Sequence, residues 1–414
     1  MVEISPLRGL VYNKEKIKDI SKVVSPPYDV VSPKNRKDLL SFSNENIISL
    51  ILPQGEGDDK YKNASRILDE WINNKILIQD GCNCYYGLRI NFKTSGAEKS
   101  LSGFIGLTRI EDYSSGGVLR HEKTLSGPKE DRFKLLESCR TNFGLIYTIY
   151  KRSRAVKDIL DHNLGQEPDI SIIPCYDSSL AFDLWKISDK DEVEKITAAM
   201  KERQILIADG HHRYETSLMY RNKFPGAGST PGPEDYVLML FMDSSQEELK
   251  IYPTHRSLTF KKDIDMEEII RLLSDKYDIN PTVIKDGTDV ISLLGNFDNN
   301  KETGFLFHTR KGSYSLVLKE GHSHDGLEKP DVFILHEDLI DELDKIFGLE
   351  DISFNHDSDQ IIEDILENHF DLGIFLNPPT ISDMEKICYS GGLMPQKSTY
   401  FWPKPCTGLV MYKL

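Results

Sequence analysis

The sequence changes from apolar to polar within Ala208-Asp209-Gly210-His211-His212-Arg213-Tyr214-Glu215-Thr216, directly after the apolar run Ile205-Leu206-Ile207. This pattern predicts a strand that ends in an Asp-Gly turn and leads into a helix. The first N–H groups of a helix have no partner inside it, and together with the helix dipole they attract anions. Arg213 adds a guanidinium fork that matches pairs of phosphate oxygens. We therefore predict a phosphate site here; the alternative is a surface histidine pair with an Arg213–Glu215 contact.

Composition excludes several classes of protein. The chain has 414 residues and a net charge of −15, which weighs against a nucleic-acid surface because phosphate backbones need a basic face. The start, Met1 to Pro6, has no apolar core of a signal peptide, and no apolar run is long enough to span a membrane. The six cysteines are scattered, so we expect reduced thiols in a cytoplasmic protein. Cys82-Asn83-Cys84 lacks the usual zinc spacing, and the sequence indicates no other metal-ligand set.

The elements alternate along the chain, which predicts a mixed α/β fold. We expect helices at Tyr61–Asn73 and Lys190–Lys201, and another that begins with Ser32 as N-cap and Pro33 as first residue. Strands are expected at 84–92, 101–110, 145–150, 181–187 and 236–242, and also at Ile47–Leu52, Ile251–Arg256 and Asp371–Leu376. The last of these is expected to return the chain to the core. The length favours two or three domains, and we place soft boundaries to give residues 1–115, 116–260 and 261–414.

A second candidate constellation is His121-Glu122-Lys123-Thr124, which precedes the turn Ser126-Gly127-Pro128. Glu122 is placed to act as a general base toward a hydroxyl group, with His121 and Thr124 beside the substrate. The alternative is a solvated strand end. The following Lys129-Glu130-Asp131-Arg132 has its acids in the first turn of a helix, where they favour the helix dipole, so we assign it a mainly structural role.

Three further segments complete the predicted site. Lys397-Ser398-Thr399 follows two glycines and offers a cation and two hydroxyls to phosphate, although it lacks the order of a Walker loop. Tyr28-Asp29 follows a rigid proline pair and either binds a substrate amine or ribose hydroxyl or caps a turn. The Pro- and Gly-rich stretch Phe224–Glu234 is either a lid or a plain surface loop.

The chain is identified as resembling the prokaryotic family filed as domain of unknown function 1015. The resemblance runs from end to end and is carried by several specific stretches, which are 6–10, 26–30, 51–53, 121–132, 208–216, 253–256 and 394–399. It implies a shared fold and leaves the activity open.

A second resemblance covers roughly residues 118–222. Asp209-Gly210-His211-His212-Arg213 is similar to the phosphate-binding motif of the ParB/sulfiredoxin superfamily, whose free-serine kinase branch combines such a motif with an upstream catalytic Glu. The resemblance implies a nucleotide-binding core of that type with α/β additions at both ends. It also implies that Glu122 lies near His212, although a long stretch of chain separates them.

Together these patterns predict an enzyme that transfers a phosphoryl group between ATP or ADP and a small hydroxylated metabolite, with serine as the leading candidate. Gly210, His211, His212, Arg213 and Lys397–Thr399 would hold phosphates, Asp209 would orient a hydroxyl or a magnesium ion, and Glu122 would deprotonate the acceptor, with His212 beside it. A phosphatase or nucleotide hydrolase using the same pocket is the alternative. A ParB-like DNA-binding or regulatory protein is the second alternative, and a homodimer is left open.

Overall fold

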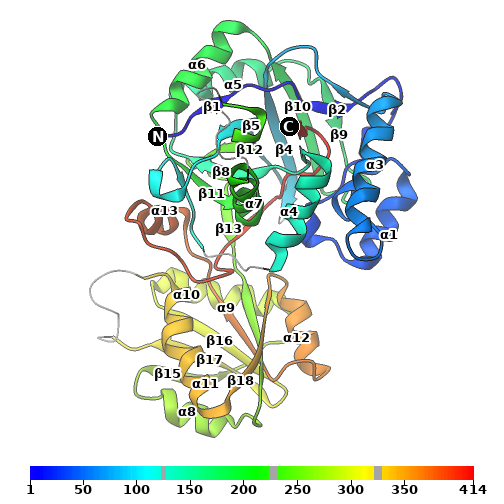
Figure 1. Ribbon diagram of the computed structural model, residues 1–414. Coiled ribbons are helices and arrows are strands. Elements are labelled where there is room, and N and C mark those ends of the chain that lie inside the picture. The colour runs from blue at the N-terminus through cyan, green and yellow to red at the C-terminus, as the bar shows by residue number, and fades with distance from the viewer. Residues whose placement is uncertain (95, 123–126, 224–230, 321–328) are drawn as a thin grey trace. The chain divides into compact units, whose positions relative to one another are not determined.

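The computed structural model describes residues 1–94, 96–122, 127–223, 231–320 and 329–414. It is a mixed α/β protein, as the alternating sequence pattern predicts. The chain divides into two compact units, of which the first comprises Met1–Leu249 with Pro403–Leu414 and the second Lys250–Trp402 (Figure 1). No helix among the described residues has the length and apolar character needed to cross a membrane.

A nine-stranded sheet forms the centre of the first unit, with the order β6-β11-β8-β12-β5-β4-β10-β9 and β1 beside β5. Most neighbours are antiparallel, because hairpins such as β4–β5 build this part of the sheet. Only β6 with β11 and β8 with β12 run parallel among the described strands. The strands are β1 Ile4–Ser5, β4 Tyr85–Thr94, β5 Ala97–Arg109, β6 Val118–Leu119, β8 Ile146–Tyr150, β9 Ile170–Ile172, β10 Leu180–Ile187, β11 Ile205–Asp209 and β12 Tyr236–Asp243.

Helices cover this sheet and close its core. The apolar sides of α5 (Arg154–Leu164) and α6 (Lys190–Lys201) join buried sheet residues such as Phe104 and Phe241 in one cluster. Helix α4 (Gly127–Cys139) packs against both α7 (His211–Asn222) and α3 (Asp59–Asn73) (Figure 1). The predicted helices at 61–73 and 190–201 are therefore confirmed. Helix α1 (Pro33–Phe42) also begins as expected, because the Ser32 side chain accepts a hydrogen bond from Asn35 N.

The expected strand at Ile47–Leu52 is wrong, because Ile48–Ile51 forms the short helix α2. The buried Asn46 side chain accepts from Ile48 N at 3.0 Å and donates to Lys22 O and Val24 O, so the chain turns at this point. Ile48, Leu50 and Ile51 are all buried. A short apolar run that is buried on several sides has no periodicity that separates a strand from a helix.

The second unit has its own six-stranded sheet, with the order β15-β17-β16-β19-β14-β18. A separate apolar cluster, which includes Leu306, Ile361 and Phe375, forms its core. The strands of this unit are β13 Lys250–Tyr252, β14 His255–Phe260, β15 Tyr277–Thr282, β16 Gly304–Thr309, β17 Gly312–Leu318, β18 Leu349–Asn355, β19 Leu372–Leu376 and β20 Tyr400–Trp402. The helices are α8 Met266–Leu273, α9 Gly287–Asn300, α10 Asp331–Ile334, η5 Leu335–Ile340, α11 Asp341–Phe347, α12 Ser358–Leu366 and α13 Ile381–Tyr389.

Two strands expected in this region need correction. Asp371–Leu376 does not return the chain to the first core, because β19 pairs with β14 and β16 inside the second unit. The expected strand Ile251–Arg256 is two strands, β13 and β14, since Pro253 cannot donate a ladder hydrogen bond. The two units also differ from the expected boundaries at 115 and 260, because residues on both sides of position 115 share the nine-stranded sheet.

The chain returns to the first unit only at Pro403. Thr407 and Ser25 exchange two backbone hydrogen bonds, and Met411 does the same with Leu10. Strand β21 (Tyr412–Lys413) then pairs with β7 (Thr141–Asn142). The last twelve residues therefore form backbone hydrogen bonds with Leu10, Ser25 and β7. The remaining elements are β2 Leu10–Tyr12, β3 Leu77–Gln79, η1 Ile20–Lys22, η2 Tyr28–Val30, η3 Tyr113–Ser115 and η4 Pro233–Asp235.

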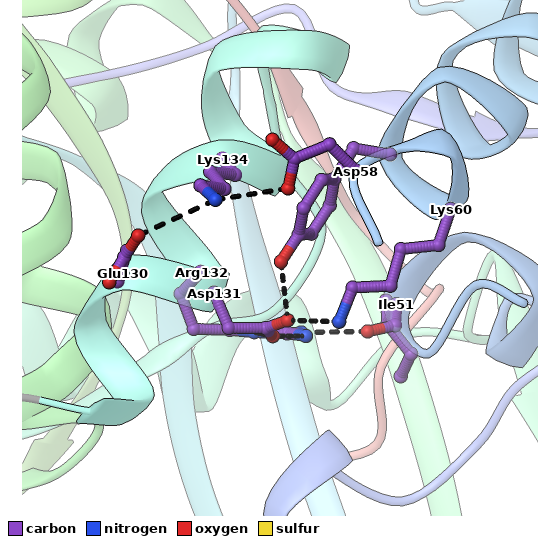
Figure 2. A network of polar contacts seen from close by, with 8 residues as sticks. Ile51, Asp58, Lys60, Glu130, Asp131, Arg132 and Lys134 are labelled. Carbon is purple, nitrogen blue, oxygen red and sulfur yellow. Dashed lines mark hydrogen bonds and ion pairs between the residues drawn. The ribbon is translucent and has the colours of Figure 1, made fainter. Parts of the chain in front are cut away.

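A polar network fixes α4 to α3 and α2, as Figure 2 shows. Asp131 accepts hydrogen bonds from Lys60 Nζ and from Tyr61 OH, both at 2.7 Å. Arg132 donates to Asp131 and to Ile51 O, the latter at 2.7 Å. Burial alone would raise the pKa of Asp131, but Lys60 and Arg132 outweigh it and hold the pKa well below its usual range. The structural role expected for residues 129–132 therefore fits Asp131 and Arg132.

We predict that Asp131→Asn lowers the free energy of unfolding by about 1–2 kcal/mol at neutral pH, because it weakens charge-assisted bonds that are partly screened by solvent. A carboxyl whose pKa is lower in the folded than in the unfolded state stabilises the fold at any pH above its unfolded-state pKa. This stabilisation is lost as the pH falls through the folded-state pKa. The difference in free energy of unfolding between Asp131→Asn and wild type should therefore become smaller below about pH 4, as measured by unfolding curves.

The matched control is Glu130→Gln, whose side chain is 76% exposed on the same turn. This control should stay within about 0.5 kcal/mol of wild type at every pH. If the loss of stability in Asp131→Asn relative to wild type did not change on acidification, the role given to the carboxylate would be contradicted.

Candidate functional site

The predicted strand–turn–helix junction is present, as β11, Gly210 and α7. Ala208 is an extra residue in the pairing of β11 with β8, and such a bulge re-aims the side chain that follows, here Asp209. Gly210 has φ +99°, and a Cβ at this position would lie 3.0 Å from Arg213 Nε. Gly210 is the N-cap of α7 and has no side chain that could cap the first turn. The turn therefore presents a helix N-terminus without an N-cap side chain.

Asp209 lies between two cations. Its Oδ2 accepts from Arg213 Nη2 at 2.6 Å, and its Oδ1 from Lys404 Nζ at 2.5 Å. Burial favours the neutral acid, but Lys404 and Arg213 outweigh it and hold the pKa of Asp209 well below its usual range. For Lys404, burial opposes the charge and Asp209 and Asp29 restore it, so that its pKa is raised. Asp209 and Lys404 are therefore both ionised at neutral pH.

The second constellation lies beside this turn. Val118 and Leu119 of β6 pair in parallel with Ile205 and Leu206 of β11, so both strands lead to the same edge of the sheet. His121 Nδ1 donates to Ile207 O at 2.8 Å. Glu122 Oε1 lies 3.5 Å from His211 Nδ1, and the rings of His121 and His211 meet edge to face at 4.5 Å. The structure thus brings together the two motifs that are far apart in the sequence.

Both imidazoles in this cluster are almost fully buried, His121 at 1% and His211 at 3% exposure. Burial lowers the pKa of His121, and for His211 burial and the neighbouring His121 lower the pKa well below its usual value. Both are neutral at physiological pH. One ring nitrogen of each and one Glu122 oxygen lie within 4.8 Å of one another, a donor set that could hold a metal ion. The spacing of these residues along the sequence does not mark them as a metal-ligand set.

Tyr28 and Asp29 also lie near the turn. The Arg132 guanidinium stacks 4.3 Å from the centre of the Tyr28 ring. Burial raises the pKa of Tyr28, while Arg213 acts on it in the opposite direction. Tyr28 and Arg213 line one pocket of about 600 Å³, counting the space open to solvent. Its other walls come from α4, from the segment 141–146 and from the C-terminal segment, and include Leu135, Asn142, Phe143, Gly144 and Thr407.

Other predicted residues are placed as follows. His212 follows His211 on α7 and is half-buried. Lys397, Ser398 and Thr399 belong to the second unit, where Ser398 Oγ donates to Pro395 O at 2.5 Å. Thr124 lies outside the described residues, as do residues 224–230 of the segment considered as a lid.

Sequence reasoning missed the contributions of Lys404 and Glu215. Lys404 reaches Asp209 only because the C-terminal segment returns to the first unit, and no local motif marks it. Glu215 is in the central motif, but it pairs with Lys129 at 2.5 Å and Arg120 at 3.4 Å instead of with Arg213. These pairs place two more cations near the start of α7, and they involve Lys129, which was assigned only a structural role.

The fold and site define a mixed α/β protein with an uncapped helix N-terminus, a cluster of cations and a carboxylate–histidine group at one sheet edge. The chain belongs to the family described as "Protein of unknown function (DUF1015)", whose model matches residues 4–345. The family resemblance inferred from the sequence is thereby confirmed.

Solved structures give weaker likenesses. A free serine kinase in complex with AMP is 13% identical, with a TM-score of 0.36 over 71% of this chain and 89% of that chain. A conserved hypothetical protein from Pyrococcus furiosus is 14% identical, with a TM-score of 0.35 over 70% of this chain and 88% of that one. A C-terminally truncated SbnI from Staphylococcus aureus is 8% identical, with a TM-score of 0.35 over 74% of this chain and 86% of that chain. With TM-scores well below 0.5, these likenesses do not fix the fold or activity of this chain. No curated protein matches it significantly.

The turn itself yields a stability prediction. Gly210→Ala should lower the free energy of unfolding by about 1–2 kcal/mol, because a residue with a Cβ is strained in the left-handed region. The new Cβ would also displace the Arg213 guanidinium. Thermal unfolding of the purified variants measures the effect.

Gly144→Ala is the matched control, since its Cβ would meet the same guanidinium at 3.4 Å, an ordinary contact. We expect it to change stability by no more than about 0.5 kcal/mol. Equal stability of Gly210→Ala and wild type would show that the turn does not have the described conformation.

Proposed function

We propose that this protein transfers a phosphoryl group between ATP or ADP and a small hydroxylated metabolite, with free serine as the leading acceptor. The observation that carries the proposal is the 3.5 Å approach of Glu122 to His211 at the uncapped start of α7. A carboxylate that can take a proton is thus next to a turn that can hold phosphate. Phosphoryl transfer needs these two functions in contact.

The phosphate-holding part has several sources of positive potential. The first N–H groups of α7 attract anions, and the residues of the turn that carry them are His211, His212 and Arg213. Arg213 and Lys404 are held by Asp209, so their charges are fixed in place before a ligand arrives. Preorganised cations stabilise the charge of a phosphoryl-transfer transition state without the cost of reorganisation.

Magnesium is expected with the nucleotide. Both carboxylate oxygens of Asp209 already face a cation, at 2.6 and 2.5 Å, so Asp209 is poorly suited to hold a second divalent ion as well. We therefore assign magnesium to the phosphates, and we assign Asp209 to the positioning of Arg213 and Lys404. A phosphate-bound magnesium ion neutralises charge on the transferred group.

Glu122 is the proposed general base. Its side chain is 17% exposed, so it can meet an acceptor while remaining partly shielded from water. The neighbouring imidazoles are neutral, so neither forms an ion pair with the Glu122 carboxylate. In the transfer, the acceptor oxygen forms a bond to the terminal phosphorus of the nucleotide, the bond to the leaving phosphate breaks, and the hydroxyl proton passes to Glu122.

The pocket beside Arg213 suits a ligand with an apolar body and a charged end. Leu135, Phe143 and Ile146 provide apolar walls, and Arg213 and Thr216 provide polar groups near the start of α7. We assign this pocket to the nucleoside, next to the phosphate turn. Serine as the acceptor rests on the similarity of the Asp209–Arg213 motif to that of the free-serine kinase branch.

The deciding experiment is incubation of the purified protein with serine and a panel of other hydroxylated metabolites, with ATP or ADP and magnesium, followed by phosphorus NMR. A phosphate-ester resonance that requires the acceptor supports the proposal. Release of inorganic phosphate alone, independent of any acceptor, would replace it with hydrolysis. No turnover of either nucleotide with any acceptor would overturn it.

The phosphate-binding role predicts that Arg213→Ala weakens nucleotide binding by about 1.5–3 kcal/mol, the range for hydrogen bonds to charged groups. Calorimetric titration with ADP and ATP measures this change. Arg221→Ala is the matched control, because Arg221 is on the same helix and also pairs with a carboxylate, Asp235, and donates to a backbone carbonyl. Arg221 is at the far end of α7, so the Arg221→Ala variant should bind nucleotide as tightly as wild type does. Equal losses in both variants would refute the assignment.

The general base predicts that Glu122→Gln lowers turnover by about 10²–10⁴-fold, because the amide cannot accept the proton. Nucleotide affinity should stay within about twofold, since the phosphates are held by the separate turn. Steady-state kinetics and calorimetry on the same preparation test both statements. Glu111→Gln is the control, because Glu111 accepts a structural bond from Val118 N at 2.9 Å ahead of β6. Unchanged turnover of Glu122→Gln would remove it from the mechanism, and Asp29 would be the next carboxylate to test.

A further inference from the structure

His121, Glu122 and His211 form a compact group of nitrogen and oxygen donors. One atom from each residue lies within 4.8 Å of the other two, and Glu122 Oε1 is 3.5 Å from His211 Nδ1. Ligand atoms about 2.1 Å from a tetrahedral ion lie roughly 3.4 Å apart. The widest pair therefore needs to close by no more than about 1.4 Å around an ion. Movements of this size are within reach of side-chain torsions.

We propose that His121, Glu122 and His211 bind a divalent transition-metal ion of the zinc type at the sheet edge. Two imidazoles and one carboxylate are a donor set that zinc accepts, with the fourth position left open for water or another oxygen ligand. The set is too rich in nitrogen for magnesium, which prefers oxygen ligands in octahedral geometry.

The surroundings of His121 support this assignment independently of the distances. Metal-binding histidines usually donate their other ring N–H to a carbonyl or carboxylate, which fixes the tautomer. His121 does so, since Nδ1 donates to Ile207 O, and it would bind through Nε2. His211 presents Nδ1 to Glu122 Oε1 at 3.5 Å, so it would bind the ion through this nitrogen. Glu122 supplies the negative charge that offsets part of the charge of the ion.

This inference goes beyond the proposed phosphoryl transfer and does not depend on it. The two share Glu122, so a bound ion would occupy the carboxylate that is proposed to accept the acceptor's proton. A zinc-type ion would then inhibit transfer by ligating the base. Metal binding is measured without nucleotide or acceptor, so its failure is distinguishable from failure of the proposed reaction.

The test is equilibrium dialysis of the chelator-treated, full-length protein against Zn²⁺, with bound metal measured by mass spectrometry. Exposed thiols also bind zinc, so the experiment uses a Cys82→Ser, Cys175→Ser background, both of which are exposed in the structure. One ion per chain is expected. Substitution of Co²⁺ should give visible d–d bands typical of four-coordination without the charge-transfer band of a thiolate ligand.

Glu122→Gln and His211→Gln should each weaken Zn²⁺ binding at least about 100-fold, because loss of even a neighbouring partner of a ligand costs up to that much. His162→Gln, an exposed histidine at the end of α5, is the control and should bind as wild type does. The Glu122 side chain is partly exposed and glutamine has nearly the same shape, so Glu122→Gln tests the proposal even if His211→Gln fails to fold. No stoichiometric binding, undiminished binding by Glu122→Gln, or a thiolate band with Co²⁺ would each overturn the assignment.

Discussion

The parallel pairing of β6 with β11 is the constraint on which the candidate site depends. Val118 and Leu119 lie opposite Ile205 and Leu206, so the residues that follow both strands emerge at the same edge. His121 reinforces the arrangement with its hydrogen bond to Ile207 O inside the neighbouring strand. The carboxylate of Glu122 consequently lies beside the start of α7, although the chain forms three other strands of this sheet between the two segments. A shift of one residue would turn every side chain of the shifted strand to the opposite face and separate the motifs.

The turn after β11 concentrates charge in a protein whose net charge is −15. Asp209 pairs with Arg213 and Lys404, and Glu215 pairs with Arg120 and Lys129, so two acidic side chains hold four basic ones near the start of α7. Removal of one partner from such a partly buried group leaves a charge without its counter-ion, which is strongly destabilising. The acids therefore keep the cations in position, and the uncapped helix start adds further attraction for anions. An acidic surface and a small basic pocket are thus compatible within one molecule.

Next to these ions, His121 and His211 are kept neutral by burial, which makes the chemistry at the sheet edge different from that at the turn. The turn offers fixed positive charge to an anion, whereas the Glu122 group offers lone pairs to a proton or a metal ion. The C-terminal segment completes the arrangement, because its backbone bonds from Thr407 to Ser25 hold Lys404 near Asp209. The site consequently depends on three distant parts of the chain.

The sequence by itself determined the local elements with strong patterns: the capped start of α1, the helices α3 and α6, the strands β4 and β5 and the strand–Gly–helix turn at Asp209–Arg213. These follow from capping, periodicity and backbone sterics, which act over a few residues. Only the tertiary structure decided that Ile48–Ile51 is a helix, because burial on several sides hides its period, and that Leu372–Leu376 belongs to a second sheet. It alone also placed Glu122 beside His211 and Lys404 beside Asp209. Such contacts depend on strand order and on the course of the chain between them, and no short stretch of sequence encodes either.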